Sequence, residues 1–333
     1  MESLSYETPM KAVYIKEFGG AENLEIREVP DLSPPTAAEV LVRVRAAGLN
    51  RADLLQRRGH YPPPAGYSSR IPGLEFAGEV VETGDQAVDV KAGQRVFGIT
   101  AGEAQAEFLK IDHRHLAHIP DNLSFTDAGA VPEAFITAND AVFTQAKLSD
   151  GETLLIHAVG SGVGLAALQI AKARGHHVVG TSRTRDKLDR CRQFGLDESI
   201  VVGSSVKFAD QIAGSIDVIL DLVGASYFEE NLKALAVKGR LMLVGLTSSA
   251  KAEFNLGMAL SKRLTLIGTV LRGRSTEEKA EATREFAENV VPLLAAGKIK
   301  TNVDRVFALH DVRAAHEYLE SNESFGKVVL SFD

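Results

Sequence analysis

Residues 153–167, TLLIHAVGSGVGLAA, constrain the fold of this chain more than any other segment. A short apolar run ends in Gly160, Gly162 and Gly164, and a small-residue helical pattern, LAALQIAKA, follows at once. Strand, tight glycine turn and helix in this order are typical of a dinucleotide site, because the backbone can approach a pyrophosphate and the first helical N–H groups face its charge. Glycine turns also occur between strands and helices that bind nothing, so the context on both sides is what favours a dinucleotide.

The end of the next predicted strand indicates which dinucleotide fits. NAD sites usually place an acid about 20 residues after the glycine turn, where it binds the ribose 2′-hydroxyl. Here the sequence reads GTSR at 180–183, Arg185 and Lys187 follow, and no carboxylate precedes Asp186. A hydroxyl and cations suit a 2′-phosphate, which favours NADPH over NADH. The alternative is that Arg185 and Lys187 only solvate the exposed face of a helix.

Length, charge and cysteine content exclude several classes of protein. A chain of 333 residues is too long for one core of ordinary size, so we expect two domains. The formal net charge of −7 argues against a basic surface that binds nucleic acid. No apolar run is long enough to cross a bilayer. One cysteine, Cys191, cannot form an intramolecular disulfide or a cysteine zinc cluster. We expect a cytoplasmic protein whose first residues form a short tail rather than a signal peptide.

Residues 11–130 are predicted to be mostly β-structure. Apolar and polar residues alternate with the period of a strand, and Gly, Pro and Asp separate the segments. The predicted strands are 11–18, 39–50, 76–84, 94–100 and 106–112. Short strands with long connections favour a curled antiparallel unit.

After Pro132 the pattern changes to apolar strands that alternate with amphipathic helices. Helices are predicted to start near Gly162, Thr184, Ser226 and Asn255. This alternation predicts an α/β fold with a parallel, doubly wound six-stranded sheet and helices on both faces. The six predicted strands are 153–159, 177–182, 199–202, 217–223, 240–246 and 264–271.

The last segment has no strand position left in that sheet. It contains a charged helix at 275–297, a strand, a short helix at 311–320 and a final strand at 327–332. We therefore expect these residues to return to the first domain. The predicted domains are 10–131, a nucleotide-binding domain at 132–272, and 273–333 as the second part of the first domain.

Several side chains with reactive groups have simpler interpretations. His113, His115 and His118 form H-x-H-x-x-H, but no nearby acid or cysteine completes a metal site, so we expect them on the surface. His157 is predicted to be buried and structural. Cys191 lies in a predicted helix and is expected to pack rather than react.

The motifs together resemble a known family. The segments GLNRADLLQRRGHYPPP, PGLEFAGEVVETG, AGQRVFG, PEAFITANDAVF, HAVGSGVG and FGKVVL are similar, in this order, to the zinc-independent NADPH:quinone oxidoreductases of the medium-chain dehydrogenase/reductase superfamily. The resemblance implies a GroES-like β domain split around a Rossmann domain, with the active site in the cleft between them. Zinc-dependent relatives carry a cysteine in the segment that corresponds to AAGLNRAD of this chain, and a histidine before the acid of their G-H-E motif. This chain has no cysteine there and has Leu74 in the histidine position, so no metal is expected.

The resemblance also implies roles for individual residues. Asn50 would lie near the nicotinamide, Asp53 would orient its loop, and Tyr61 would line the mouth of the cleft, where it either packs or donates a proton. The pyrophosphate would contact Ser161, Gly162 and Val163, and the 2′-phosphate would contact Ser182, Arg183 and Lys187. The nicotinamide would be bordered by Gly245, Leu246 and Leu271, and Lys327 would close over the cofactor.

Three functions stay open at this point. The first is NADPH-dependent reduction of quinones by hydride transfer without zinc. The second is reduction of alkenals or enoyl thioesters at the carbon–carbon double bond. The third is a sensor or scaffold that binds NADPH without catalysis. Family members usually form dimers through an edge strand of the nucleotide domain, so the resemblance and the apolar segment at 264–271 predict a homodimer.

Overall fold

The computed structural model describes residues 9–203 and 206–332, which form two compact units. The first unit contains the chain up to Ile136, Leu271–Ala295 and the residues from Thr301 on. The second contains Thr137–Val270 and Ala296–Lys300. One unit is thus inserted into the other, as the α/β fold class with a split GroES-like domain requires. The predicted boundaries at 131/132 and 272/273 stay predictions, and the predicted N-terminal tail lies outside the described residues.

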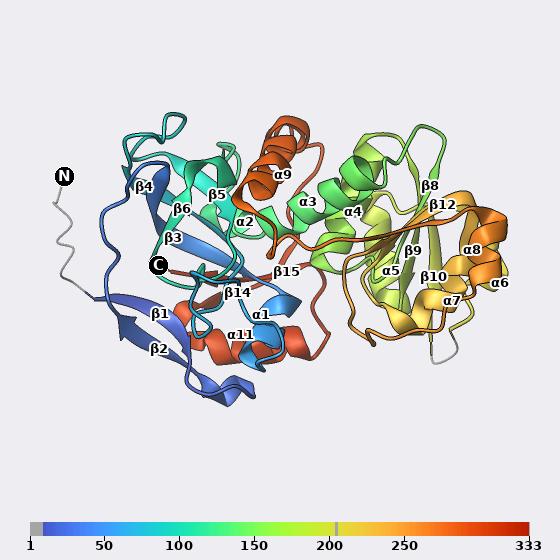
Figure 1. Cartoon of the computed structure of the whole chain (residues 1–333), viewed down its shortest axis with the longest axis horizontal. Helices are drawn as coiled ribbons and strands as arrows, with labels where there is room; N and C mark the ends of the chain where they lie inside the picture. The colour runs from blue at the N-terminus through green and yellow to red at the C-terminus, as the bar shows by residue number, and fades with distance from the viewer. Residues whose placement is uncertain (1–8, 204–205, 333) are drawn as a thin grey trace. The chain divides into compact units, whose positions relative to one another are not determined.

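The first unit is built around a seven-stranded sheet, with a separate two-stranded ribbon (Figure 1). The ribbon consists of β1 (Met10–Ile15) and β2 (Leu24–Val29). The large sheet has the order β14-β15-β3-β4-β5-β7, with β6 paired to β3. Its strands are β3 (Glu39–Leu49), β4 (Glu75–Thr83), β5 (Arg95–Ile99), β6 (Phe108–Asp112), β7 (Leu116–His118), β14 (Val303–Ala308) and β15 (Lys327–Ser331).

The pairing of β15 with β3 joins the two ends of this unit. Val328 lies opposite Leu49, and the two strands run antiparallel. In Figure 1 the red β15 accordingly lies beside the blue β3. The antiparallel unit predicted for residues 11–130 is confirmed, because the strand pairs of that segment are antiparallel. β14 and β15, which come from the last segment of the chain, are parallel to each other. The helix α11 (Val312–Glu320), which connects these two strands, allows this, since parallel neighbours need a crossover.

Helices also begin in this unit, and the one at Pro132–Asn139 continues past its boundary at Ile136. They are α1 (Arg51–Arg57), α2 (Phe125–Ala128), α3 (Pro132–Asn139), α9 (Thr276–Asn289), α10 (Val291–Ala295) and α11 (Val312–Glu320). The predicted single helix at 275–297 is wrong, because it is divided at Val290. Pro292 lies two residues after Val290 and has no N–H to continue the helical hydrogen-bond ladder.

The second unit has the predicted doubly wound sheet, in the order β10-β9-β8-β11-β12-β13 with every pair parallel. Helices α4 and α5 lie on one face and α7 and α8 on the other (Figure 1). The strands are β8 (Thr153–Ile156), β9 (His177–Ser182), β10 (Glu198–Val201), β11 (Ile216–Asp221), β12 (Leu235–Leu243) and β13 (Thr265–Gly268). The helices are α4 (Gly162–Ala173), α5 (Arg185–Cys191), α6 (Ala209–Ile212), α7 (Ala225–Ala234) and α8 (Leu256–Lys262).

The central strands β8 and β11 are mostly apolar because both faces of the sheet are covered. Leu155, Val179 and Ile219 lie in one core with residues of α6 and α7. The carboxyl ends of the parallel strands meet at one edge, and the glycine turn after β8 lies there. Among the helices that the structure describes, none combines the length and apolar character that a bilayer crossing requires.

Candidate active site

The turn after β8 has the geometry of an anion-binding helix start. Ser161 is the N-cap of α4, and its hydroxyl accepts a hydrogen bond of 3.2 Å from the Gly164 N–H. A Cβ on Gly164 would lie 2.7 Å from the carbonyl oxygens of Ala158 and Val159, so only glycine fits. The N–H groups of Gly162 and Val163 have no acceptor within the helix, as at every helix start. Together with the Ser161 hydroxyl they form the donor set that a pyrophosphate needs.

The end of β9 carries the residues predicted to read a 2′-phosphate. Ser182 is the last residue of β9 and is buried, while Arg183 is exposed beyond it. Lys187 lies in the first turns of α5, partly exposed. The nearest acid, Asp186, points its side chain into solvent, with 79% of its surface exposed. A hydroxyl and two cations at and just beyond the end of β9 suit a phosphate better than a ribose hydroxyl.

A buried polar network supports the strand ends beneath these loops. The Nδ1 atom of His157 lies 2.9 Å from Thr181 Oγ1, and its Nε2 atom lies 2.6 Å from Asn231 Oδ1. Asn231 donates to Asp221 Oδ2 at 3.0 Å, so its Oδ1 accepts and the proton of a neutral His157 lies on Nε2. Burial lowers the pKa of His157 and keeps the ring neutral. The prediction that His157 is buried and structural is confirmed.

Asp221 connects this network to the loops after β11 and β12. Its Oδ1 atom accepts from the N–H groups of Val223 and Gly224, at 2.7 and 2.9 Å. Its backbone oxygen accepts from the N–H of Gly245 at 3.2 Å. Gly245 and the exposed Leu246 therefore lie at the same sheet edge as the glycine turn. Leu271, predicted to join them, is buried and belongs to the first unit.

In the first unit, Asn50 is held by three polar partners. It is the N-cap of α1, and its N–H donates to Asp53 Oδ2 at 2.8 Å. Its Nδ2 atom donates to Glu75 Oε1 at 2.8 Å, and its Oδ1 atom accepts from Lys327 Nζ at 2.7 Å. The orientation of the amide is therefore fixed. The second Nδ2 hydrogen has only the carbonyl of Gly48, at 3.5 Å, and is weakly engaged.

Lys327 is a buried cation that neutralises Glu75. Its ammonium group donates to Glu75 Oε1 at 2.5 Å, to Asn50 Oδ1, and to the carbonyl of Leu49 at 2.8 Å. Lys327 is 6% exposed and Glu75 is 0% exposed, so neither charge is hydrated. All three ammonium hydrogens are used inside this unit. The predicted contact of Lys327 with the cofactor stays a prediction.

Asp53 is a second buried carboxyl beside Asn50. Its Oδ1 atom accepts from the Gly73 N–H at 3.0 Å, and its Oδ2 atom from the Asn50 N–H. Burial raises the pKa of Asp53 to about 6, against these hydrogen bonds and the charges of Lys327 and Arg272. Two backbone segments are thus tied to one carboxylate. The geometry agrees with the predicted orienting role of Asp53, which stays a prediction.

Tyr61 lies over a buried guanidinium group that the sequence did not single out. Arg272 lies 4.8 Å from the centre of the Tyr61 ring and donates to the Tyr61 carbonyl at 2.8 Å. It also donates to the carbonyl of Ala101 at 2.7 Å and to the side chain of Gln56. Burial, and then the carboxyl of Glu133, raise the pKa of the Tyr61 hydroxyl. Tyr61 is therefore a neutral donor at physiological pH.

Glu133 is a further acid that sequence reasoning missed. It follows Pro132 at the start of α3, and its N–H donates to Glu75 Oε2 at 2.9 Å. Burial, and then the negative charge of Glu75, raise the pKa of Glu133 to about 8. Glu75 and Glu133 lie within the quoted motifs PGLE and PEAF, and these motifs were the only sequence signal that could have drawn attention to the two acids. Nothing local in those motifs indicates that the Glu133 N–H reaches the Glu75 carboxylate.

Comparison with known proteins identifies the family. The model of the zinc-binding dehydrogenase family matches residues 162–288, and that of the alcohol dehydrogenase GroES-like domain matches residues 36–147. The chain is 33% identical over 326 residues to a quinone oxidoreductase of Pseudomonas aeruginosa, which covers 96% of this chain and 99% of that protein. This chain belongs to the medium-chain dehydrogenase/reductase superfamily. It is an oxidoreductase of that superfamily.

Two further members of the superfamily cover its full length. Acryloyl-coenzyme A reductase of Metallosphaera sedula is 31% identical over 357 residues, which covers 97% of this chain and 100% of that protein. The solved structure of Escherichia coli quinone oxidoreductase complexed with NADPH has a TM-score of 0.84 at 30% identity. The alignment covers 97% of this chain and 99% of that one. Relatives of both predicted reductase classes are therefore similar to this chain.

The name of the matching family implies a zinc ion, which would need side chains that can coordinate it. The described residues contain no group of three or more His, Cys, Asp or Glu side chains that could hold a metal ion. Leu74 precedes Glu75, and the cation beside Glu75 is the ammonium group of Lys327. A zinc ion there would meet a positive charge and too few soft ligands. These residues do not fit a catalytic zinc ion.

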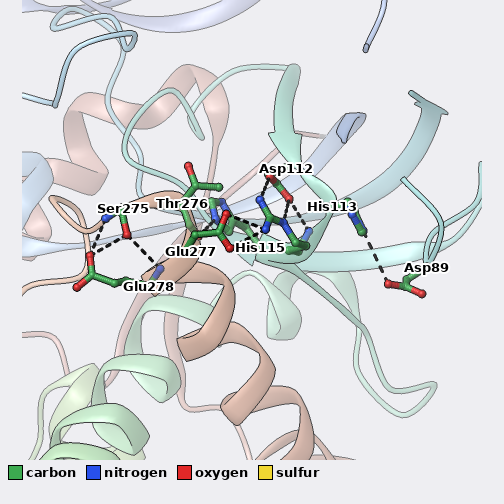
Figure 2. Close-up of polar contacts among 9 residues, drawn as sticks. Asp89, Asp112, His113, His115, Ser275, Thr276, Glu277 and Glu278 are labelled. Carbon is green, nitrogen blue, oxygen red and sulfur yellow. Dashed lines mark hydrogen bonds and ion pairs between the residues drawn. The ribbon is translucent and has the colours of Figure 1, made fainter. Parts of the chain in front are cut away.

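The histidine motif has a structural role in this superfamily member. His115 Nε2 lies 2.9 Å from the carbonyl oxygen of Thr276 at the start of α9, as Figure 2 shows. Arg114 joins Asp112 and Glu277, each at 2.8 Å. The predicted surface position is therefore wrong for His115, which is 5% exposed, and holds for His118. The reason is that α9, which begins 161 residues further along the chain, covers this loop.

Cys191 is confirmed as a packing residue. It is the last residue of α5 and is fully buried. Burial raises the pKa of its thiol to about 12, so the thiolate that a nucleophile requires is absent at neutral pH.

Proposed function

We propose that this protein uses NADPH to reduce quinones by hydride transfer, without zinc. The observation that carries the proposal is a pair of candidate phosphate-binding positions in the second unit. One is the start of α4, where Ser161, Gly162 and Val163 supply donors to a pyrophosphate. The other is the end of β9, where Ser182, Arg183 and Lys187 suit the 2′-phosphate. The similarity to a quinone oxidoreductase complexed with NADPH supports the same cofactor.

In this proposal the bound nicotinamide supplies the hydride, and the protein supplies placement and electrostatics. Reduction of a quinone or enone leaves a negative charge on the acceptor oxygen. The weakly engaged Nδ2 hydrogen of Asn50 is a fixed donor for that charge, because Glu75 and Lys327 hold the amide plane. The Tyr61 hydroxyl is a second donor. We propose that the acceptor is reduced beside these two residues.

A second candidate function is reduction of an enoyl thioester or alkenal at the carbon–carbon double bond. The specific observation in its favour is the similarity to acryloyl-coenzyme A reductase over the whole chain. Such a reaction needs a proton at carbon as well as a hydride. The acidic groups beside Asn50 are consistent with that need.

Steady-state oxidation of NADPH tests the two candidates against each other. The acceptors are 1,2-quinones, 1,4-quinones, alkenals and an acryloyl thioester, with NADH as the matched reductant. We expect quinones to give the highest kcat/KM and NADPH to exceed NADH. Faster turnover of the thioester would replace the first candidate by the second. NADPH binding without turnover of any acceptor would leave only a sensor or scaffold.

We further propose a cytoplasmic homodimer joined through the nucleotide-binding units. β13 is the edge strand of the six-stranded sheet, and the neighbouring α8 exposes Leu256 and Leu260 at 72% and 81%. Pairing two copies along β13 would satisfy the open edge. Light scattering after gel filtration at micromolar concentration tests this. A mass near the 35.8 kDa of one chain would contradict it.

A further inference from the structure

Five charged or ionisable side chains of the first unit form one cluster next to Asn50. Three are acids, namely Asp53, Glu75 and Glu133, and two are bases, namely Lys327 and Arg272. Each of these bases lowers the pKa of Asp53 and of Glu133 through its charge, which places all five within one electrostatic environment. The interior position of these groups makes ionisation of all three acids unfavourable.

The hydrogen bonds decide which acid keeps a proton. Glu75 accepts from Lys327, from Asn50 and from the Glu133 N–H, so it has the partners of a carboxylate. Asp53 accepts two backbone N–H groups, from Asn50 and Gly73. In residues 9–203 and 206–332, no donor lies within hydrogen-bonding distance of the Glu133 carboxyl. Glu133 is therefore the least stabilised carboxylate of the three.

The groups that face Glu133 reinforce this. Glu75 on β4 and Asp53 on α1 repel its charge, while Lys327 on β15 and Arg272 attract it. Lys279 on α9 and the Tyr61 hydroxyl also lie within electrostatic range of Glu133. The net effect, with burial, raises the pKa of Glu133 to about 8. Its carboxyl is mostly protonated at neutral pH.

Glu133 is also placed where a proton is useful. The backbone N–H of Glu133 donates to one oxygen of Glu75, and the side-chain amide of Asn50 donates to the other. Two hydrogen bonds therefore connect the Glu133 backbone to Asn50 through Glu75. Glu133 keeps some exposed surface, unlike Glu75 and Asp53. A protonated carboxyl with no internal partner can give its proton to a molecule bound there and recover it from water.

We propose that Glu133 is the proton donor for the acceptor, an assignment that rests on the proposed reductase function. Hydride adds to the acceptor, and an electron pair of its reduced double bond moves to the acceptor oxygen. The O–H bond of Glu133 breaks as the proton passes to that oxygen, directly or through Tyr61. NADPH is oxidised to NADP⁺, the acceptor is reduced by two electrons, and the Glu133 carboxylate takes a proton from water.

The test is Glu133→Gln, which keeps the shape of the side chain but has no acidic proton. In the wild type, kcat should fall as the pH rises through about 8, because the protonated carboxyl is the active form. The variant should lose about 100-fold in kcat at pH 7 and should lose this pH dependence, since general acid catalysis contributes roughly 10²–10⁴-fold. NADPH affinity, measured by fluorescence titration, should not change. Glu79→Gln is the matched control, because Glu79 pairs with Arg45 elsewhere in the same unit.

A second measurement uses the protein without cofactor. Potentiometric titration from pH 7 to 9 should show the wild type releasing about one more proton than Glu133→Gln, because the carboxyl titrates in this range. Glu79→Gln should match the wild type.

The outcomes separate the two proposals. If the wild type turns over an acceptor and Glu133→Gln has an equal kcat or an unchanged pH profile, the role of Glu133 is overturned. The reductase function is then left intact. An equal proton release by both proteins overturns the role of Glu133 as well. An absence of turnover by the wild type with every acceptor overturns the reductase function and this role together.

Discussion

The ammonium group of Lys327 lies 2.5 Å from Oε1 of Glu75, and both side chains are buried. The two residues are 252 positions apart in the sequence. They join β15, the last strand, to β4 of the same unit, and the Asn50 amide completes the contact on one side. Their ion pair therefore fixes both the closure of the GroES-like unit and the orientation of a predicted active-site amide.

Removing the cation should destabilise the protein strongly. Lys327→Met leaves the Glu75 carboxylate buried without its partner, which costs about 3–5 kcal/mol in comparable buried pairs. Urea unfolding monitored by circular dichroism measures the loss. The double variant Lys327→Met/Glu75→Gln should recover part of the stability, because no unpaired charge remains. Lys298→Met, at an exposed lysine, should change little. A loss of under ~1 kcal/mol in Lys327→Met would contradict the importance of this pair.

Cofactor preference should depend on the cations after β9. Arg183→Ala/Lys187→Ala should raise KM for NADPH by roughly 10-fold or more, because each charge-assisted contact to a phosphate contributes about 1.5–3 kcal/mol at most. KM for NADH should hardly change, since NADH has no 2′-phosphate. Steady-state kinetics with both reductants measures the ratio, and Lys298→Ala serves as the control. Equal losses for the two reductants would show that these cations do not read the phosphate.

The glycine turn should not tolerate a side chain. Gly164→Ala would place a Cβ 2.7 Å from two backbone oxygens, so the turn must shift away from the pyrophosphate. We expect NADPH affinity to fall by at least ~10-fold and the melting temperature to drop by a few degrees. Calorimetric titration and thermal unfolding measure the two effects. Gly273→Ala is the control, because a Cβ there meets nothing within 4 Å. Unchanged NADPH affinity in Gly164→Ala would remove this turn from the cofactor site.

Stability should fall on mild acidification because of His316. This residue is fully buried, and burial, with the charge of Arg57, lowers its pKa to about 3. Its ordinary pKa is about 6.5, so between pH 6.5 and pH 3 the unfolded chain binds a proton that the folded chain does not. The stabilising contribution is complete above pH 6.5 and is lost as the pH falls, by up to ~1.4 kcal/mol per pH unit.

Urea unfolding at several pH values checks this expectation. His316→Gln should flatten the slope of unfolding free energy against pH between 6.5 and 4. His118→Gln, at an exposed histidine, should leave the slope as it is in the wild type. The same slope in His316→Gln as in the wild type would show that another group causes the acid sensitivity.

Much of the nucleotide-binding unit could be predicted from the sequence. The order of its six strands along the chain and the start of α4 near Gly162 follow from local patterns. Hydrophobic periodicity and glycine positions are properties of neighbouring residues, so they are visible without the fold. The breaks that were missed, such as the one at Val290, are also local but depend on a single proline.

The acidic cluster could not be predicted in this way. Glu75, Glu133 and Arg272 come from separate segments, and no spacing rule connects them. Their pKa values depend on how much water the folded chain removes and on which charges it brings together. The burial of His115 under α9 is another example, since its covering residue lies 161 positions away.

The sequence by itself determined the glycine turn, the absence of a carboxylate between Gly180 and Asp186, and the alternation that builds a parallel sheet, because each of these is a short-range property. Only the tertiary structure decided that a lysine ammonium pairs with Glu75 and that, among the residues the structure describes, none donates a hydrogen bond to the Glu133 carboxyl. The physical reason is that charge stabilisation in a protein interior depends on distance and desolvation, which arise when remote strands pair.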